Sequence, residues 1–414
     1  MEVVHPRCCG LEVPKETVVA GVLVATRPGH ADQVVRPCGT TTAAVLALGA
    51  WLAAQEVSPV AMEATGVSWQ PLGTLLGTLL EGRCALLLVN AAQVKAVPGR
   101  KTDVADSEWL ADLLRHGLLR SSVVPPRPQR DRREVTRPRA HLGGTRTAAV
   151  NRRHKPVAGT NLTLGRVISD LTGVSGRAIL AALLAGQTAP AQLAALAVGR
   201  WRAKLPALAE ALGGHLSDQQ RFLLRQHLAL IDVREGQIAA VDEQSATRLA
   251  PQEDLVVRWE AIPGVGRRTA EVIAAEVGTD VTRFPRADHL TRWAGVCPGQ
   301  EERAGQRRSG KTRKGTRALR AALCAAAKAA GRTKPSALGR RYRRLQERLG
   351  AQQATVAMAR HILAAVDHMI KEGTPYREPT PTPRGPLARR ADQRHPVQAR
   401  EDLGFHVVLQ PIAA

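Results

Sequence analysis

The chain has 414 residues, enough for two or three domains that each bury a core of their own. Its 59 Lys and Arg residues against 36 Asp and Glu give a formal net charge of +23, which is typical of proteins that bind a polyanion. The basic residues are clustered, with ten in 127–155, eight in 303–320 and seven in 332–348. These blocks favour nucleic acid over a membrane surface as the partner, because a general solubility surface would mix the two signs of charge.

Composition also excludes several classes of protein. No apolar run reaches the roughly 20 residues that span a bilayer, and the first ten residues lack the apolar core of a signal peptide. The six cysteines show no CxxC spacing, so neither a zinc site nor a disulfide framework is indicated. We therefore expect a reduced, cytoplasmic protein with no membrane partner. Because aromatic residues are only 3% of the chain, contacts to a nucleic-acid backbone should matter more than base stacking.

The first 126 residues alternate between strand and helix patterns. Apolar, β-branched runs predict buried strands at 18–25, 59–63 and 84–89. Helical spacing of the apolar residues predicts helices at 43–56, 72–80 and 103–119. This alternation predicts an α/β domain with a mostly parallel sheet. Sites in such sheets lie at the carboxyl ends of strands, where Glu63 falls.

The rest of the chain reads as mainly helical. The pattern predicts a helical or coiled-coil arm at 127–255, a mainly α domain at 256–371 and a proline-rich, flexible tail at 372–414. One long exposed helix is expected within the arm at 222–249. Pro138 and the glycine pair at 143–144 are expected to interrupt the arm, since an interior Pro costs about 3 kcal/mol and an interior Gly about 1 kcal/mol.

Two aspartates at the start of the helix predicted at 103–119 suggest a metal site. Asp103 and Asp106 are three residues apart and share one helical face, so they can hold one divalent cation together. Mg²⁺ prefers oxygen ligands and usually sits between carboxylates and substrate phosphates. The basic pair Arg100 and Lys101 precedes them, which suggests chemistry on a phosphodiester. The alternative is a solvated helix start, where Asp is favoured near the positive end of the helix dipole.

The segment 262–273 has the form of a helix-hairpin-helix turn. Gly264 and Gly266 would let the backbone approach a phosphate closely, and the helix that follows offers unpaired N–H groups. The alternative is a tight corner between two helices, with no ligand.

A second basic segment, 305–312, fits the letter pattern of a nucleotide phosphate-binding loop. The residues before it are too polar for the buried strand which that loop requires, so we interpret the match as chance. A basic loop leading into a helix at 316–330 describes it better. The nucleic-acid-binding residues predicted along the chain are Lys101, Gly264, Gly266, Arg267, Arg307, Arg308, Lys311, Arg313, Lys314, Arg317 and Arg320.

Six segments together form a more specific pattern. They run from Gly10 to Lys15, Met62 to Val67, Lys101 to Asp106, Ile262 to Gly266, Trp293 to Gly299 and Ser309 to Arg320. In this order they resemble the motifs of DEDD-type transposases of the insertion-sequence-110 group, also described as RNA-guided recombinases. The resemblance extends over nearly the whole chain and into two separate domains.

This resemblance implies a RuvC-like, RNase H-type fold at the N-terminus, then a helical arm and a C-terminal transposase domain. It implies a Mg²⁺ site made of four acids, which map to Glu12, Glu63, Asp103 and Asp106. It also implies a serine in the C-terminal domain that attacks DNA and forms a transient covalent link. Members of the group are thought to act as dimers or tetramers, with a structured guide RNA that pairs with donor and target DNA.

The chain departs from the family pattern at two positions. Glu12 stands where the family has Asp, which moves the carboxylate about one methylene further out, whereas Mg²⁺ demands near-ideal octahedral geometry. Arg303 stands at the position of the nucleophilic serine, and its permanently protonated guanidinium cannot attack DNA. Ser309 belongs to a different part of the motif and is a poor substitute.

We therefore expect a transposase by descent whose strand-transfer chemistry is impaired. Two alternatives remain open. One is a catalytically inactive remnant that still binds nucleic acid, and the other is a RuvC-like, metal-dependent junction nuclease.

Overall fold

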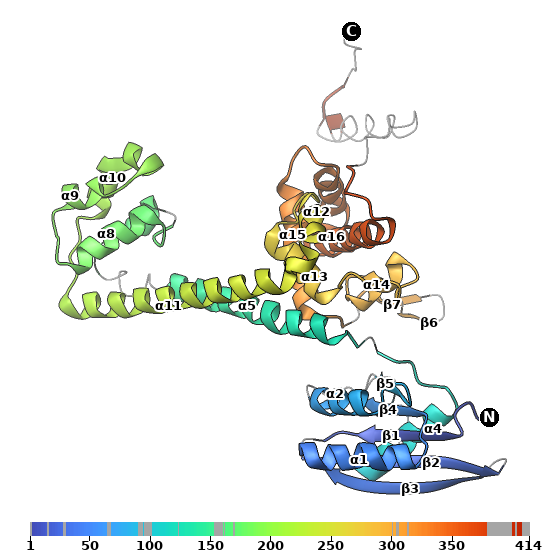
Figure 1. Ribbon diagram of the computed structural model, residues 1–414. Coiled ribbons are helices and arrows are strands. Elements are labelled where there is room, and N and C mark those ends of the chain that lie inside the picture. Colours follow the sequence, from blue (N-terminus) through green and yellow to red (C-terminus); the bar gives the residue numbers. More distant parts are fainter. Residues whose placement is uncertain are drawn as a thin grey trace. The chain divides into compact units, whose positions relative to one another are not determined.

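The computed structural model divides the chain into two compact units, Met1–Pro126 and Arg127–Ala414, and each is described by itself (Figure 1). The structure describes residues 2–14, 16–27, 30–63, 68–89, 94, 102–122, 124–152, 160, 162–168, 170–299, 301–303, 306–312, 314–378, 400–401 and 404–407. Side chains within 301–309 are not described.

The first unit is built on one mixed sheet of five strands. Its strands are β1 (Arg7–Glu12), β2 (Thr17–Arg27), β3 (His30–Gly39), β4 (Pro59–Glu63) and β5 (Ala85–Val89). Their order across the sheet is β3-β2-β1-β4-β5. Strands β1, β2 and β3 pair antiparallel, whereas β1, β4 and β5 pair parallel.

The expectation of a mostly parallel sheet is therefore wrong. The cause is β2, which pairs antiparallel with both β1 and β3, and the sequence pattern did not reveal β3. Most side chains of β3 are exposed or half-buried, and Pro37 lies within it. An outer strand of this kind has no continuous apolar run, so the pattern that reveals a buried strand is absent there.

Helices cover both faces of this sheet (Figure 1). On one face α1 (Thr42–Ala54) and α2 (Trp69–Leu79) bury a core that includes Leu11, Leu48, Met62 and Leu76. On the other face α4 (Asp103–Arg115) buries a smaller core that includes Cys8, Ala61, Val89, Leu110 and Leu114. Alternate residues of β1 and β4 therefore face opposite layers, as the period of two in a strand requires.

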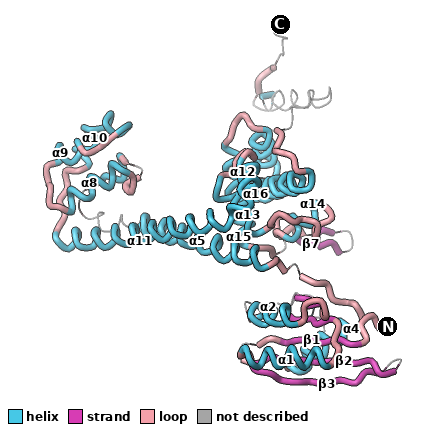
Figure 2. The backbone as a smooth tube through the Cα atoms, viewed as in Figure 1, coloured by secondary structure: helices cyan, strands magenta, loops and turns pink. Residues whose placement is uncertain are grey.

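The second unit begins with two long helices that lie side by side and antiparallel (Figure 2). They are α5 (Arg127–Arg152) and α11 (Asp218–Leu249). The intervening chain forms a helical cluster with its own core, made of α7 (Leu164–Val167), α8 (Val174–Leu184), α9 (Pro190–Ala195), the 3₁₀ helix η1 (Gly199–Lys204) and α10 (Leu205–Ala211). Helix α11 starts at a capping box in which the side chains of Ser217 and Gln220 each accept the other's backbone N–H.

The expected interruption of the arm at Pro138 and the glycine pair is wrong, because α5 runs continuously through all three residues. Both neighbours of the proline are anchored: Arg137 donates to Glu276, and Arg139 donates to Asp242. These contacts with other helices hold the helical backbone where its own hydrogen bonding is weakened.

The remainder of this unit is a compact set of helices and one hairpin. Its elements are η2 (Ala250–Gln252), α12 (Glu253–Glu260), α13 (Arg267–Glu276), α14 (Ala287–Trp293), β6 (Glu301–Arg303), β7 (Gln306–Ser309), α15 (Arg317–Arg332) and α16 (Ala337–Glu372). Helix α15 packs against both α13 and α16. Among the helices of the described chain, none combines the length and the apolar character needed to cross a bilayer.

Helix α16 is two helices joined at a sharp corner. Gly350 interrupts it with φ 78° and ψ 166°, a conformation open essentially to glycine alone. Tyr342 and Thr355 lie on opposite sides of this corner, and their hydroxyl oxygens are 3.1 Å apart. In a straight helix thirteen residues would span about 20 Å. The chain therefore folds back at Gly350.

Candidate active site and nucleic-acid interface

The strand register brings two of the predicted acids together. Glu12 ends β1 and Glu63 ends β4, and the parallel pairing of Leu11 with Met62 makes the two glutamates neighbours. Both are half-buried. By strand alternation they lie on the same face as Ala61, which packs toward α4.

Helix α4 runs along β1 in the opposite direction and brings its aspartates to the same corner. The Cys8 thiol donates to the carbonyl of Ala111 at 3.4 Å. Two residues further along β1, a Cβ added to Gly10 would collide with the carbonyl oxygen of Ser107. Two strand residues advance about 6.6 Å and four helix residues about 6 Å. Every second residue of β1 therefore lies beside every fourth residue of α4. One further step places Glu12 opposite Asp103.

Glycines permit this close approach. Gly10 pairs with Gly21 of β2, and a Cβ on Gly21 would lie 3.1 Å from Ser107. The sequence analysis did not single out Gly21 or Ser107. A glycine within each of two buried strand segments was the available signal, because such glycines often mark a site where another backbone comes close.

The start of α4 is fixed by its cap. The Thr102 hydroxyl accepts the backbone N–H of Ala105 at 3.2 Å, so Asp103 is the first helical residue and Asp106 also lies in the first turn. Asp103 is exposed and Asp106 is half-buried. This placement suits a metal site, and it equally suits the alternative of acids that favour the positive end of the helix dipole.

The four acids meet one requirement of a metal site. As oxygen donors they suit a hard cation, and the ends of β1, β4 and α4 bring them to one corner. Within the described residues, however, no three His, Cys, Asp or Glu side chains are gathered closely enough to hold a metal ion. Mg²⁺ binding by Glu12, Glu63, Asp103 and Asp106 stays a prediction. Lys101, the cation predicted to act beside them, lies outside the described residues.

The predicted helix-hairpin-helix turn lies between α12 and α13 and is partly used for packing. Gly264 has φ 89°, and a Cβ there would lie 2.5 Å from the backbone nitrogen of Ala330 in α15. The close approach that this glycine permits is therefore to α15. Gly266, just before α13, faces open space.

Arg267 in the same turn is held by acids of its own unit. Its guanidinium donates to Glu253 at 2.7 Å and to Glu271 at 3.0 Å, and these hydrogen bonds raise the pKa of Arg267. Both Gly264 and Arg267 thus have the structural role of a tight corner between helices. Contact with nucleic acid at these residues stays a prediction.

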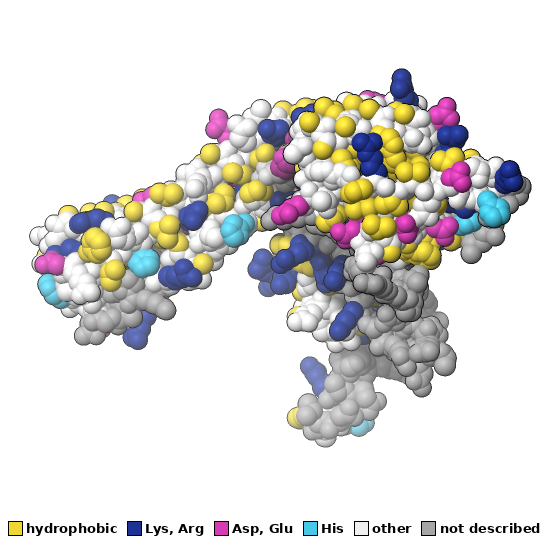
Figure 3. Space-filling view, turned by 90° about the horizontal axis from the view of Figure 1, so that it is seen from below, with side chains coloured by type: hydrophobic (Ala, Val, Ile, Leu, Met, Phe, Trp, Pro, Cys, Tyr) yellow, Lys and Arg dark blue, Asp and Glu magenta, His cyan; other side chains and the backbone are white. Residues whose placement is uncertain are grey.

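Four arginines of the basic block at 127–155 are neutralised inside the protein. Glu276 is fully buried and accepts hydrogen bonds from Arg137 at 2.7 and 3.0 Å, and it also pairs with Arg133. Asp242 and Glu235 of α11 pair in the same way with Arg139 and Arg146. These arginines offer much less charge to a partner than the sequence suggested. Figure 3 shows basic side chains both interspersed with acidic ones and, below the centre of the view, gathered in a group of their own.

The hairpin β6–β7 fixes the backbone position of Arg303. It pairs with Gln306 beside the turn, whereas Ser309 pairs with Glu301 at the open end. Ser309 therefore lies at the other end of the hairpin from position 303. Arg307 and Arg308 lie in β7 with undescribed side chains, and Arg313 is outside the described residues. The chain passes from this hairpin through a loop into α15, as expected for a basic loop.

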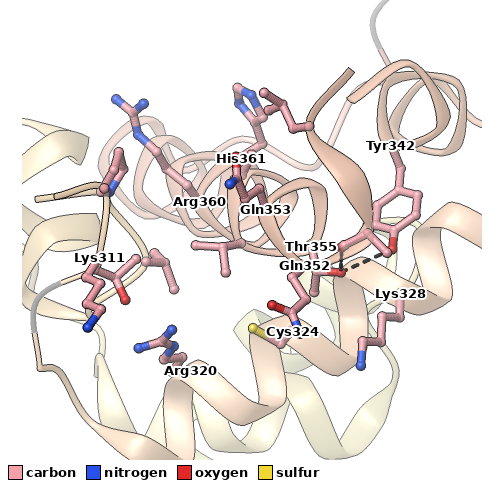
Figure 4. A pocket seen from close by; sticks show the side chains of 18 residues that line it. Lys311, Arg320, Cys324, Lys328, Tyr342, Gln352, Gln353, Thr355, Arg360 and His361 are labelled. Atoms are coloured by element: carbon pink, nitrogen blue, oxygen red, sulfur yellow. Dashed lines mark hydrogen bonds between the residues drawn. The ribbon is translucent and has the colours of Figure 1, made fainter. Parts of the chain in front are cut away.

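A cavity of about 1200 Å³ lies beyond that hairpin, and we call it the basic pocket (Figure 4). Its walls come from α15, both halves of α16 and the segments at 296–298 and 310–312. Its described lining includes no Asp or Glu, and its cations are Lys311, Arg320, Lys328 and Arg360. Lys311 and Arg320 were predicted from the sequence, whereas Lys328 and Arg360 were missed. Lys314 and Arg317, also predicted, are exposed.

Acids at one edge of a sheet, together with a basic pocket in a helical unit, are features of the class of proteins that act on nucleic acid. Two family models match the chain. One, described as "Transposase" and named for the DEDD transposases of IS110, matches residues 9–162. The other, described as "Transposase IS116/IS110/IS902 family", matches residues 258–343. They describe one group and together cover more than half of the residues, so the chain belongs to the IS110 family of insertion-sequence transposases.

A curated relative points to the same group. The chain is 34% identical over 125 residues to the "Insertion element IS110 uncharacterized 43.6 kDa protein" of Streptomyces coelicolor. The matched segment is 29% of this chain and spans 30% of that protein's length. The expected family is thereby confirmed.

Proposed function

We propose that this protein is the DNA transposase or recombinase of an insertion sequence, which cleaves and rejoins DNA strands. The observation that carries the proposal is the register of β1, β4 and α4, which brings Glu12 and Glu63 to the corner where Asp103 and Asp106 begin a helix. The mixed sheet with helices on both faces supports a RuvC-like, RNase H-type fold for this unit.

Glu12, Glu63, Asp103 and Asp106 would hold Mg²⁺. When bound, the ion would polarise the scissile phosphate and neutralise charge that develops on it. The backbone N–H groups in the first turn of α4 would also stabilise negative charge on the phosphate, because they form the positive end of the helix dipole. Sequence would be read by a guide RNA, so the protein itself needs only contacts to backbone and shape. A dimer or tetramer would assemble the site.

Strand transfer is impaired in this copy of the protein. Arg303 stands where the family places its nucleophilic serine, and a guanidinium has no lone pair available to attack phosphorus. Ser309 lies at the other end of the hairpin. The second candidate function, a nucleic-acid-binding remnant without catalysis, rests on this same substitution.

The test is recombination in vitro with the RNA and DNA ends of the element, in the presence of Mg²⁺. We expect no product from the natural protein and measurable product from Arg303→Ser combined with Glu12→Asp. Adding Asp103→Asn should abolish that product. Recombination by the natural protein would contradict the impairment, and a failure to bind DNA or RNA would contradict the proposed function as a whole.

Metal binding is measured separately, by calorimetric titration with Mg²⁺ and Mn²⁺. Asp103→Asn and Asp106→Asn should each weaken binding at least tenfold. Asp112→Asn is the matched control, because this aspartate lies two turns further along α4 and pairs with His116. Equal weakening by all three variants would show that only general negative charge is being measured.

A further inference from the structure

We infer that the basic pocket binds an unpaired strand of nucleic acid, with backbone phosphates on Arg320 and Lys328 of α15. The inference rests on the proposed function and names a substrate site within it. It is independent of the carboxylate corner in the first unit.

The first argument is the arrangement of cations along one wall. Arg320, Cys324 and Lys328 are four residues apart in turn and therefore share one face of α15, and Figure 4 shows them along one side of the pocket. The helical rise separates the outer two by about 12 Å. A single phosphate group is too short to reach both cations, whereas successive phosphates of a strand can.

The second argument is the imbalance of charge. Within the described part of the chain, neither Arg320 nor Lys328 forms an ion pair with an acid, in contrast to four of the arginines of α5. Arg360 is partly neutralised by Asp288, at 2.6 Å. A concave surface lined by cations without acids in its described lining concentrates positive potential and attracts a polyanion.

The third argument is the uncharged wall. Gln352, Gln353 and Thr355 lie opposite α15 in Figure 4, and Val356 adds an apolar surface. His361 also lines this side, and burial together with the nearby cations Arg341 and Arg360 lowers its pKa to about 4. The imidazole is therefore neutral at pH 7. Such a wall can receive a base, with amide groups able to pair with its edge.

Size and shape select a single strand. At about 1200 Å³ the pocket exceeds the roughly 300–1,000 Å³ of most small-ligand sites, so a free phosphate or one nucleotide would leave it largely empty. A double helix, whose major groove alone is about 12 Å wide, cannot enter a cavity of this size. An unpaired end or loop of DNA or RNA can.

The first experiment measures fluorescence anisotropy of a labelled 12-nucleotide oligothymidine and of a 12-base-pair duplex. The pocket variant is Arg320→Gln with Lys328→Gln. The control is Arg344→Gln with Arg348→Gln, which removes the same charge from exposed positions of α16 outside the pocket. The pocket variant should bind the single strand at least tenfold more weakly. The slope of log affinity against log salt should fall by about 1.4, since each phosphate contact on a single strand contributes about 0.7. The control should change both values little.

Several outcomes would overturn the inference. Equal losses in both variants would mean general electrostatics, and unchanged binding in the pocket variant would place the strand elsewhere. Polyglutamate competing as well as the oligonucleotide would assign the pocket to an acidic polypeptide. If the duplex still binds and the pocket variant binds the single strand as well as the natural protein does, only the assignment of the pocket is wrong. If the natural protein binds neither nucleic acid, the proposed function fails too.

The second experiment uses the natural protein, so it does not depend on variants that fold. Cys324 lines the pocket, whereas Cys38 lies in β3 of the first unit. Burial raises the pKa of both thiols, and both remain partly accessible. Alkylation with N-ethylmaleimide at pH 8.5 is followed by peptide mass spectrometry. The oligonucleotide should slow modification of Cys324 at least fivefold and leave Cys38 unaffected. Absence of protection at Cys324 would contradict the inference.

Discussion

The two basic regions of the second unit look alike in sequence and differ in structure. In α5 four of the arginines pair with acids of α11 and α13, and Glu276 is buried among them with no exposed side-chain surface. In the basic pocket, Arg320 and Lys328 share a wall with no acid among the described lining residues. A count of charges along the chain therefore does not measure the charge available to a partner. Three changes test this comparison, from the largest expected effect to the smallest.

The largest effect is expected where arginines of α5 pair with a buried acid of the same protein. Glu276→Ala leaves Arg133 and Arg137 facing each other without their shared carboxylate, and breaking a buried pair costs about 3–5 kcal/mol. The free energy of unfolding is measured by urea titration. Glu372→Ala is the control, because that acid is exposed and its ion pair with His368, at 3.6 Å, lies at the surface, so its loss should cost less than about 1 kcal/mol. Similar losses from the two variants would contradict the conclusion that the ion pairs of Glu276 hold α5 and α13 together.

The next effect concerns the corner that shapes the basic pocket. Gly350→Ala forces a side chain into a backbone region that is essentially restricted to glycine and should destabilise the protein by about 1–3 kcal/mol. Single-strand binding should weaken as well, since Leu349 and Ala351 on either side of the glycine line the pocket. Gly144→Ala, at an exposed position inside α5, should instead stabilise by about 0.5–1 kcal/mol. A stable Gly350→Ala variant with intact binding would show that the corner at Gly350 is not needed to shape the pocket.

The smallest effect at neutral pH is expected for His361, which contributes to stability through its dependence on pH. Its pKa is about 4 in the folded protein, below the ordinary 6.5 of the unfolded chain, so the unfolded state takes up the proton first. The contribution to stability is intact above pH 6.5 and declines as the pH falls from 6.5 to about 4. His361→Gln should flatten the free energy of unfolding across that range. His368→Gln, at an exposed position of the same helix, is the matched control for the substitution itself.

Local features of the fold could be predicted because their causes are local. The strand at 59–63 and the helix beginning at Asp103 were expected at the right places, since a short buried run and the helical spacing of apolar residues are signals within a few neighbouring residues. The hairpin strand β3 was missed because it lacks the continuous apolar run that marks a buried strand. Its place in the sheet depends instead on its pairing with β2. Pro138 was misjudged for a related reason, as its helix is held by contacts from other helices.

The candidate sites divide in the same way. The acids Glu12, Glu63, Asp103 and Asp106 could be named in advance. The neighbouring positions of Glu12 and Glu63 near the start of α4 depend on the register of β1 with β4, and on Gly10 and Gly21, which allow α4 to approach. Arg267 lies in the turn that was predicted to bind nucleic acid, but its guanidinium forms ion pairs with acids of α12 and α13. Lys328 could not be predicted as a site residue, because the pocket that it lines also needs both halves of α16, which fold back on each other at Gly350.

The sequence by itself determined the family, the order of most helices and strands, and which residue types are available for chemistry, because motifs and periodicity are written along the chain. Only the tertiary structure decided which of these residues meet, and which of the many cations are already paired. The physical reason is that an ion pair or a shared pocket depends on distance in space. Glu276 lies more than a hundred residues from the arginines that neutralise it, and no local pattern encodes that separation.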